Sequence, residues 1–161
     1  MGDAVSADEL AARALGKLTE QGQSLSCAES LTGGLLADAF VRIPGASQTF
    51  RGGVVTYTDA VKTAVLGVSP QLLLTNTAYD PQVAVQMSTA VRRLFRSDYA
   101  LSTTGVAGPG PDEGVAPGRG YVCLATPQGT EVREVDRPGT RAEVRAAFVR
   151  AALELLVSHL G

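Results

Sequence analysis

Apolar residues recur at the spacing of an amphipathic helix in five segments of the chain. Most of these segments begin at a residue that caps helices well, or end at glycine or proline. The predicted helices run from Ser6 to Gly22, from Thr32 to Pro44, from Asp59 (its predicted cap) to Gly67, from Asp80 to Phe95, and from Thr140 through Leu155. The first and the last of them open with the spacing of a capping box.

Short apolar and β-branched runs between the helices predict strands. Residues 24–28, 53–58 and 98–104 alternate with helices, whereas residues 121–126 and 131–136 are consecutive and predict a hairpin. Strands that alternate with helices favour parallel pairing, and a hairpin requires antiparallel pairing. We therefore expect a layered α/β domain with a mixed sheet.

Composition narrows the class of protein. A length of 161 residues favours one domain, and 45% hydrophobic residues are enough for one core. The net charge of -2, without a segment dominated by Lys and Arg, argues against nucleic acid and membrane surfaces as partners. No apolar run approaches the roughly 18 residues that span a bilayer.

The cysteines and the histidine limit the available chemistry. Cys27 and Cys123 stand alone in apolar segments, which is typical of reduced core thiols in a cytoplasmic protein. His159 is the only histidine, so a His-based triad or a His/Cys metal cluster is not expected.

Three segments are more polar and glycine-rich than packing requires. The first, residues 28–34, joins a strand to a helix, and its backbone N–H groups with the Ser30 and Thr32 hydroxyls suit a phosphate or carboxylate. An ordinary helix cap is the alternative. The third, residues 102–110, leaves a strand end where open α/β sheets bind ligands, and could form an oxyanion hole. A flexible surface loop is the alternative there. Asp112 and Glu113, farther along, are a weaker candidate for a carboxylate pair.

The second segment, residues 44–62, contains an unusual lysine. The chain has 12 arginines but only two lysines, and Lys62 is one of them. Unlike arginine, a buried lysine can lose its proton, and a neutral lysine can activate a serine. Ser47 is then the candidate nucleophile, with Tyr57 nearby. The alternative is that Lys62 is an exposed helix residue, Tyr57 a core residue and Ser47 a turn former.

Several motifs together resemble the CinA C-terminal domain family, which includes nicotinamide-nucleotide amidases. The resemblance covers residues 8–157. It rests on AESLTGG (28–34), PGAS (44–47), GGVVTYTDAVKTAVLGV (52–68), TTGVAGP (103–109) and GTRAEVR (139–145). This resemblance implies one three-layer α/β/α sandwich over residues 1–161.

The resemblance also implies a function. The expected reaction is hydrolysis of the carboxamide of nicotinamide mononucleotide (NMN) to nicotinic acid mononucleotide and ammonia, in the cytoplasm. We expect a homodimer that needs no metal and no organic cofactor. Ser47 would be the nucleophile, Lys62 its base and Tyr57 a supporting group. The expected substrate-binding residues are Ser30, Thr32, Gly33, Gly34, Thr104, Gly105 and Arg145.

The chain departs from many relatives at three places. It has Leu31 where they carry Cys, Thr77-Ala78-Tyr79-Asp80 where they carry Gly-Ala-Val-Ser, and Pro117-Gly118-Arg119-Gly120 where they carry Lys-Pro-Val-Gly. These departures keep two alternatives open. One is a non-catalytic nucleotide-binding or regulatory module of the same fold, and the other is an amidase for a different amide.

Overall fold

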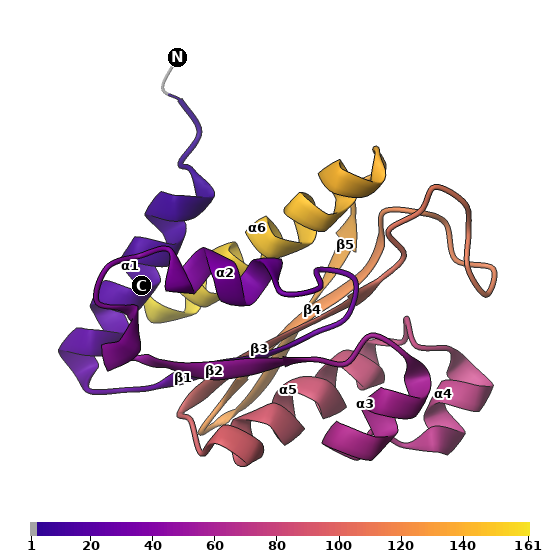
Figure 1. Ribbon diagram of the computed structural model, residues 1–161, viewed down its shortest axis with the longest axis horizontal. Coiled ribbons are helices and arrows are strands. Elements are labelled where there is room, and N and C mark those ends of the chain that lie inside the picture. The colour runs from indigo at the N-terminus through magenta and orange to yellow at the C-terminus, as the bar shows by residue number, and fades with distance from the viewer. Residues whose placement is uncertain (1–2) are drawn as a thin grey trace.

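The computed structural model describes residues 3–161, which form a five-stranded sheet with helices on both faces (Figure 1). Along the chain the elements are α1 (Ala7–Gln21), β1 (Leu25–Glu29), α2 (Leu35–Val41), the 3-10 helix η1 (Ala46–Gln48), β2 (Phe50–Val55), α3 (Asp59–Leu66), α4 (Pro70–Asn76), α5 (Pro81–Phe95), β3 (Tyr99–Gly105), β4 (Arg119–Thr126), β5 (Gly129–Asp136) and α6 (Arg141–Leu160).

The sheet is mixed, as the alternation of elements predicts. Its strand order is β2-β1-β3-β4-β5. Strands β1, β2 and β3 are parallel because helices connect them, whereas β4 pairs antiparallel with both β3 and β5. The chain leaves β1 for β2 on one side and then crosses to β3 on the other, so the direction of winding reverses at β1.

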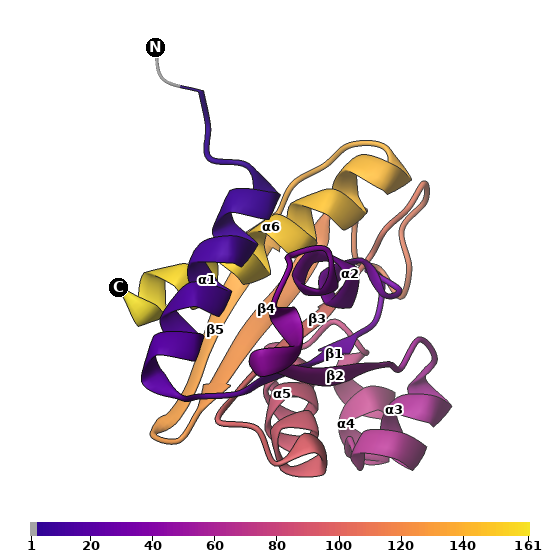
Figure 2. The same ribbon diagram turned by 60° about the vertical axis from the view of Figure 1, so that its left-hand side comes forward.

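The helices form two layers that enclose the sheet. Figures 1 and 2 show α1, α2 and α6 on one face and α3, α4 and α5 on the other. Large side chains such as Leu25 and Leu101 face the first layer, whereas the small Ala28 and Ala100 face α5. The Ser102 hydroxyl also donates to the Ala84 carbonyl of α5 at 2.7 Å. These small residues let α5 pack closely against the sheet, and the expected three-layer arrangement is confirmed.

Several local boundaries differ from the prediction; α2, for example, covers Leu35–Val41 and not Thr32–Pro44. Strand β2 covers Phe50–Val55, so Tyr57 follows the strand instead of lying on it. The cap of α3 is Thr58, whose hydroxyl accepts the N–H of Val61, and not Asp59. Helix α4 was not predicted, although Ser69 before a proline is a recognisable helix start.

The two cysteines are free and buried, as the sequence predicts. Within residues 3–161, none of the helices combines the length and the apolar character that crossing a bilayer requires.

Candidate functional site

The candidate site lies at the carboxyl ends of the parallel strands, beside the point where the winding reverses. Ser30 directly follows β1, Tyr57 follows β2, and Val106 follows β3. Open α/β sheets bind ligands at this edge because loops leave in opposite directions there and open a crevice. The loop between β3 and β4 projects from the same edge (Figure 1).

A buried lysine and a serine are in contact at this edge. The Nζ atom of Lys62, on α3, donates to Ser30 Oγ at 2.9 Å and to the Tyr57 carbonyl at 3.2 Å. Lys62 is 1% exposed and Ser30 is 6% exposed. Burial lowers the pKa of Lys62 because the charged form loses water, and the Asp59 carboxylate opposes this shift. The geometry therefore suits a neutral amine that accepts the serine proton.

A cavity of about 360 Å³ opens beside Ser30. Its walls come from the ends of β1 and β2, the segment before α5, the β3–β4 loop and the first turn of α6. The lining residues are Ser30, Leu31, Tyr57, Thr58, Asp59, Tyr79, Gly105, Val106, Ala107, Gly108, Gly110, Asp112 and Arg141. Pockets for small ligands start at roughly 300 Å³, so the cavity has the size for a small organic substrate.

Ser47 lies at the opposite edge of the sheet. It sits exposed on η1, before β2, and lines a separate cavity with Ser24 and Asp98. Lys62 follows the other end of β2, whose six residues span about 20 Å at ~3.3 Å per residue. The predicted pairing of Ser47 with Lys62 is therefore wrong, and Ser30 takes that place. The sequence contained a signal for this, because a predicted strand separates Ser47 from Lys62.

The start of α2 is not open to a substrate anion. The Glu29 carboxylate, 1% exposed, accepts the N–H groups of Leu36 at 2.8 Å and Ala37 at 3.2 Å. It occupies the helix terminus that the sequence suggested as a phosphate site. Neither Gly33 nor Gly34 lines the cavity.

The other predicted residues divide into two groups. Ser30, Tyr57 and Gly105 line the cavity. Thr32, Thr104 and Arg145 do not line it, and their side chains hydrogen-bond to other parts of the protein. The Thr104 hydroxyl, for example, donates to the Ala78 carbonyl at 2.6 Å.

Two of the three departures from the family pattern reach the cavity, one of them through Tyr79. Leu31 lines it. Asp80 caps α5 by accepting the Gln82 N–H at 2.7 Å, and Arg119 pairs with Glu134 at 3.3 Å. Neither Asp80 nor Arg119 therefore opposes a ligand in this cavity.

Two groups of lining residues were missed by the sequence analysis. Arg141 donates to the Tyr57 hydroxyl at 3.0 Å and to the Gly108 carbonyl, so it bridges two walls. It lies within the quoted GTRAEVR motif, which was its only signal. Tyr79 donates to Asp112 on the facing wall, and its only signal was its place in the Thr77–Asp80 stretch that departs from the family pattern.

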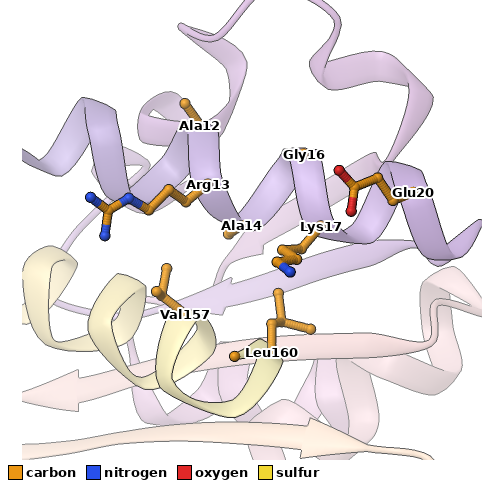
Figure 3. Close-up of a pocket in the computed structure, with 9 residues that line it drawn as sticks. Ala12, Arg13, Ala14, Gly16, Lys17, Glu20, Val157 and Leu160 are labelled. Carbon is orange, nitrogen blue, oxygen red and sulfur yellow. The ribbon is translucent and has the colours of Figure 1, made fainter.

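Another cavity, distinct from those beside Ser30 and Ser47, lies between α1 and the end of α6 (Figure 3). Its volume is about 370 Å³, and it holds none of the predicted site residues. Figure 3 shows Val157 and Leu160 facing the α1 residues Ala14 and Lys17. Across the described residues no cluster of three or more His, Cys, Asp or Glu is arranged to hold a metal ion.

Comparisons with known proteins agree with this architecture. The chain is 43% identical over 149 residues to a CinA-like protein of Frankia casuarinae, an alignment that covers 92% of this chain and 34% of that relative. The chain thus spans about a third of the length of that relative.

Solved structures match over nearly their whole length. A competence-damaged protein (CinA) superfamily protein from Enterobacter cloacae has a TM-score of 0.96 at 29% identity, covering 100% of this chain and 96% of that one. Competence/damage inducible protein CihA from Agrobacterium tumefaciens has a TM-score of 0.92 at 35% identity, covering 98% of each chain. The family model described as the CinA C-terminal domain matches residues 7–160, and the chain belongs to this family.

Proposed function

We propose that the protein hydrolyses the carboxamide of NMN to nicotinic acid mononucleotide and ammonia, with Ser30 as nucleophile and Lys62 as its base. The observation that supports this proposal is the 2.9 Å contact between Lys62 Nζ and Ser30 Oγ beside the cavity. This pair supports the proposed reaction class, and the family resemblance supports the proposed substrate.

The acylation step uses only these two side chains. The neutral amine of Lys62 takes the Ser30 hydroxyl proton while Oγ forms a bond to the carboxamide carbon. The resulting ammonium of Lys62 then protonates the amide nitrogen, the C–N bond breaks, and ammonia leaves. Lys62 is neutral again, and Ser30 carries the nicotinoyl group as an ester.

Water completes the reaction by the same route. Lys62 takes a proton from water as its oxygen attacks the ester carbon, and the proton returns to Ser30 Oγ as the C–O bond breaks. The products are a free carboxylic acid and the starting enzyme. No metal or redox group is required, since each proton and electron pair is accounted for by the amide, water, Ser30 and Lys62.

In this proposal the rest of the nucleotide lies in the cavity beside Ser30. Arg141 is the cationic side chain in its lining, and a guanidinium suits a phosphate because its N–H groups form paired hydrogen bonds. We place the substrate phosphate at Arg141 in this proposal, not at the start of α2, since Glu29 fills that site.

Ammonia release from NMN by the purified chain tests the proposal. We expect Ser30→Ala to lower kcat by about a thousandfold or more, because it removes the nucleophile. Ser47→Ala is the matched control, with activity within roughly twofold of the parent chain, because Ser47 is an exposed serine remote from Lys62. Binding of NMN without ammonia release would instead support the non-catalytic module. Loss of activity in Ser47→Ala with retention in Ser30→Ala would reverse the assignment of the nucleophile.

A further inference from the structure

The turn that carries Ser30 is held by two residues far away in the sequence. Arg145, on α6, donates from Nε to the Leu31 carbonyl at 2.8 Å and from Nη2 to the Thr32 carbonyl at 3.1 Å. Thr103, on β3, accepts the Ser30 N–H at 3.3 Å and shares a hydrogen bond of 2.9 Å with the Thr32 hydroxyl. The turn is therefore fixed from both sides at its backbone.

These contacts leave two backbone donors unused beside the nucleophile. Leu31 is 4% exposed and Thr32 is 0% exposed. Within residues 3–161, neither of their N–H groups donates to a protein acceptor, whereas the N–H of Ser30 is taken by Thr103 and that of Gly33 by the Ser30 carbonyl. Buried N–H groups without an acceptor are rare, because each costs free energy comparable to a lost hydrogen bond. Such donors point to a ligand oxygen.

The orientation of one of these donors follows from peptide geometry. In a planar trans peptide the carbonyl and the following N–H point in opposite directions. Arg145 holds the Leu31 carbonyl, so the Thr32 N–H points away from the guanidinium. Arginine suits this role because its fork can hold two adjacent carbonyls, which the single ammonium of lysine cannot do in the same geometry.

We propose that Arg145 and Thr103 are positioning residues that hold the Leu31 and Thr32 N–H groups as the oxyanion hole for the Ser30 reaction. This inference rests on the proposed acyl chemistry of Ser30. It replaces the expectation that Arg145 binds substrate. An oxyanion hole is effective because its donors are fixed before charge develops, so loosening the turn slows the chemical step more than it weakens binding.

Steady-state kinetics on two substrates separates positioning from phosphate binding. We compare NMN with nicotinamide riboside, which has the same carboxamide and no phosphate. Arg145→Lys and Thr103→Val are expected to lower kcat by about 100-fold on both substrates, as for a displaced catalytic group, with KM changed by less than about threefold. Thr103→Ser keeps the hydroxyl and should restore most of kcat.

The matched control is Ser102→Ala. Ser102 is the neighbour of Thr103 on β3, equally buried, but its hydroxyl contacts Ala84 on α5 instead of the turn. We expect this variant to keep the parent kcat. A rise in KM for NMN alone in Arg145→Lys, with kcat retained, would overturn the inference and make Arg145 a phosphate ligand. Parent-like kcat in both Arg145→Lys and Thr103→Val would also overturn it.

A second readout does not depend on the identity of the substrate. A fluorophosphonate probe phosphonylates an activated serine and presents an oxygen to the oxyanion hole, and mass spectrometry locates the label. We expect slower labelling of Ser30 in Arg145→Lys and Thr103→Val than in the parent chain and Ser102→Ala. Slower labelling in a chain that does not hydrolyse NMN would support the positioning role and reject NMN as substrate. Equal labelling in all four chains would reject the positioning role alone.

Discussion

At the scale of single residues, the central feature is an amine buried at 1% exposure. A buried ammonium loses its hydration, which costs several kcal/mol in an apolar setting, so burial favours the neutral amine that a serine needs as its base. Among residues 3–161, the acceptors hydrogen-bonded to Lys62 Nζ are Ser30 Oγ and the Tyr57 carbonyl. Burial of Lys62 therefore lowers the stability of the folded chain and, in the proposed reaction, favours the neutral amine that acts as the base.

We expect Lys62→Met to abolish ammonia release and to raise the melting temperature. The folded-state pKa of Lys62 is lowered, so the unfolded chain binds more protons between the folded pKa and the unfolded pKa near 10.4. The destabilisation by Lys62 is thus fully present below the folded pKa and disappears as pH rises toward the unfolded pKa. The gain in melting temperature of Lys62→Met should shrink over that window. Thermal unfolding of both chains at a series of pH values measures this gain in melting temperature. A variant that is less stable than the parent at every pH would contradict the prediction.

The same residue sets the pH dependence of activity. Only neutral Lys62 can accept the Ser30 proton, so kcat/KM should fall as pH decreases through the folded pKa of Lys62, which lies below its ordinary value. A pH profile of ammonia release on the parent chain checks this. A rate that increases toward acid would exclude Lys62 as the general base.

At the scale of elements, the first five residues of α6 form part of the candidate site. They include Arg141, which lines the cavity, and Arg145, which holds the Ser30 turn. The capping box fixes the start of α6: the Glu143 N–H donates to Thr140 Oγ1 at 3.2 Å and the Thr140 N–H donates to Glu143 Oε1 at 3.0 Å. The Thr140 backbone N–H and, to a smaller extent, the Thr140 side chain also lower the pKa of the Glu143 carboxyl.

We expect Thr140→Ala to lower the free energy of unfolding by about 1 kcal/mol, the usual cost of losing a side-chain cap, and to lower kcat as well. Ser6→Ala is the matched control, because Ser6 caps α1 in the same way, by accepting the Glu9 N–H at 3.1 Å, away from the site. Urea unfolding and ammonia release on both variants make the comparison. Equal loss of activity in the two variants would show that the start of α6 has no special relation to the site.

At the scale of the whole molecule, two facing glycines set the distance between the sheet and α6. Gly105 on β3 pairs with Gly120 on β4, and Phe148 of α6 packs over both. A Cβ atom at Gly120 would lie 2.9 Å from the Phe148 ring and would overlap the Thr104 carbonyl oxygen. Close packing of Phe148 on these two glycines places the start of α6 beside the ends of β1 and β3.

Gly120→Ala should therefore destabilise the protein by roughly 1–3 kcal/mol, as overpacking does. Gly16→Ala is the control: Gly16 lies in α1 with nothing within 4 Å of the added Cβ, so helix propensity favours alanine there by up to about 1 kcal/mol. Chemical unfolding of both variants gives the two free energies. A Gly120→Ala variant as stable as the parent would show that α6 can move away from the sheet without a loss in the free energy of unfolding.

The sequence alone determined most of the elements and several helix caps, since capping and apolar spacing act over a few residues, but it missed α4 and displaced the ends of α2 and β2. Ser6, Thr140 and Asp80 cap the helices that they predict, and the late hairpin and the mixed sheet follow from element order. The motifs also identified the family and singled out Lys62 and Ser30.

Only the tertiary structure decided which residues meet. Ser47 is closer to Lys62 in the sequence, yet β2 carries the chain away from it, whereas the parallel pairing of β1 with β2 brings Ser30 to the same edge. Likewise, Glu29 fills the start of α2, and Arg145 reaches back from α6 to the Ser30 turn. Such contacts depend on strand order and on how closely the layers pack, and neither is encoded within any short stretch of the chain.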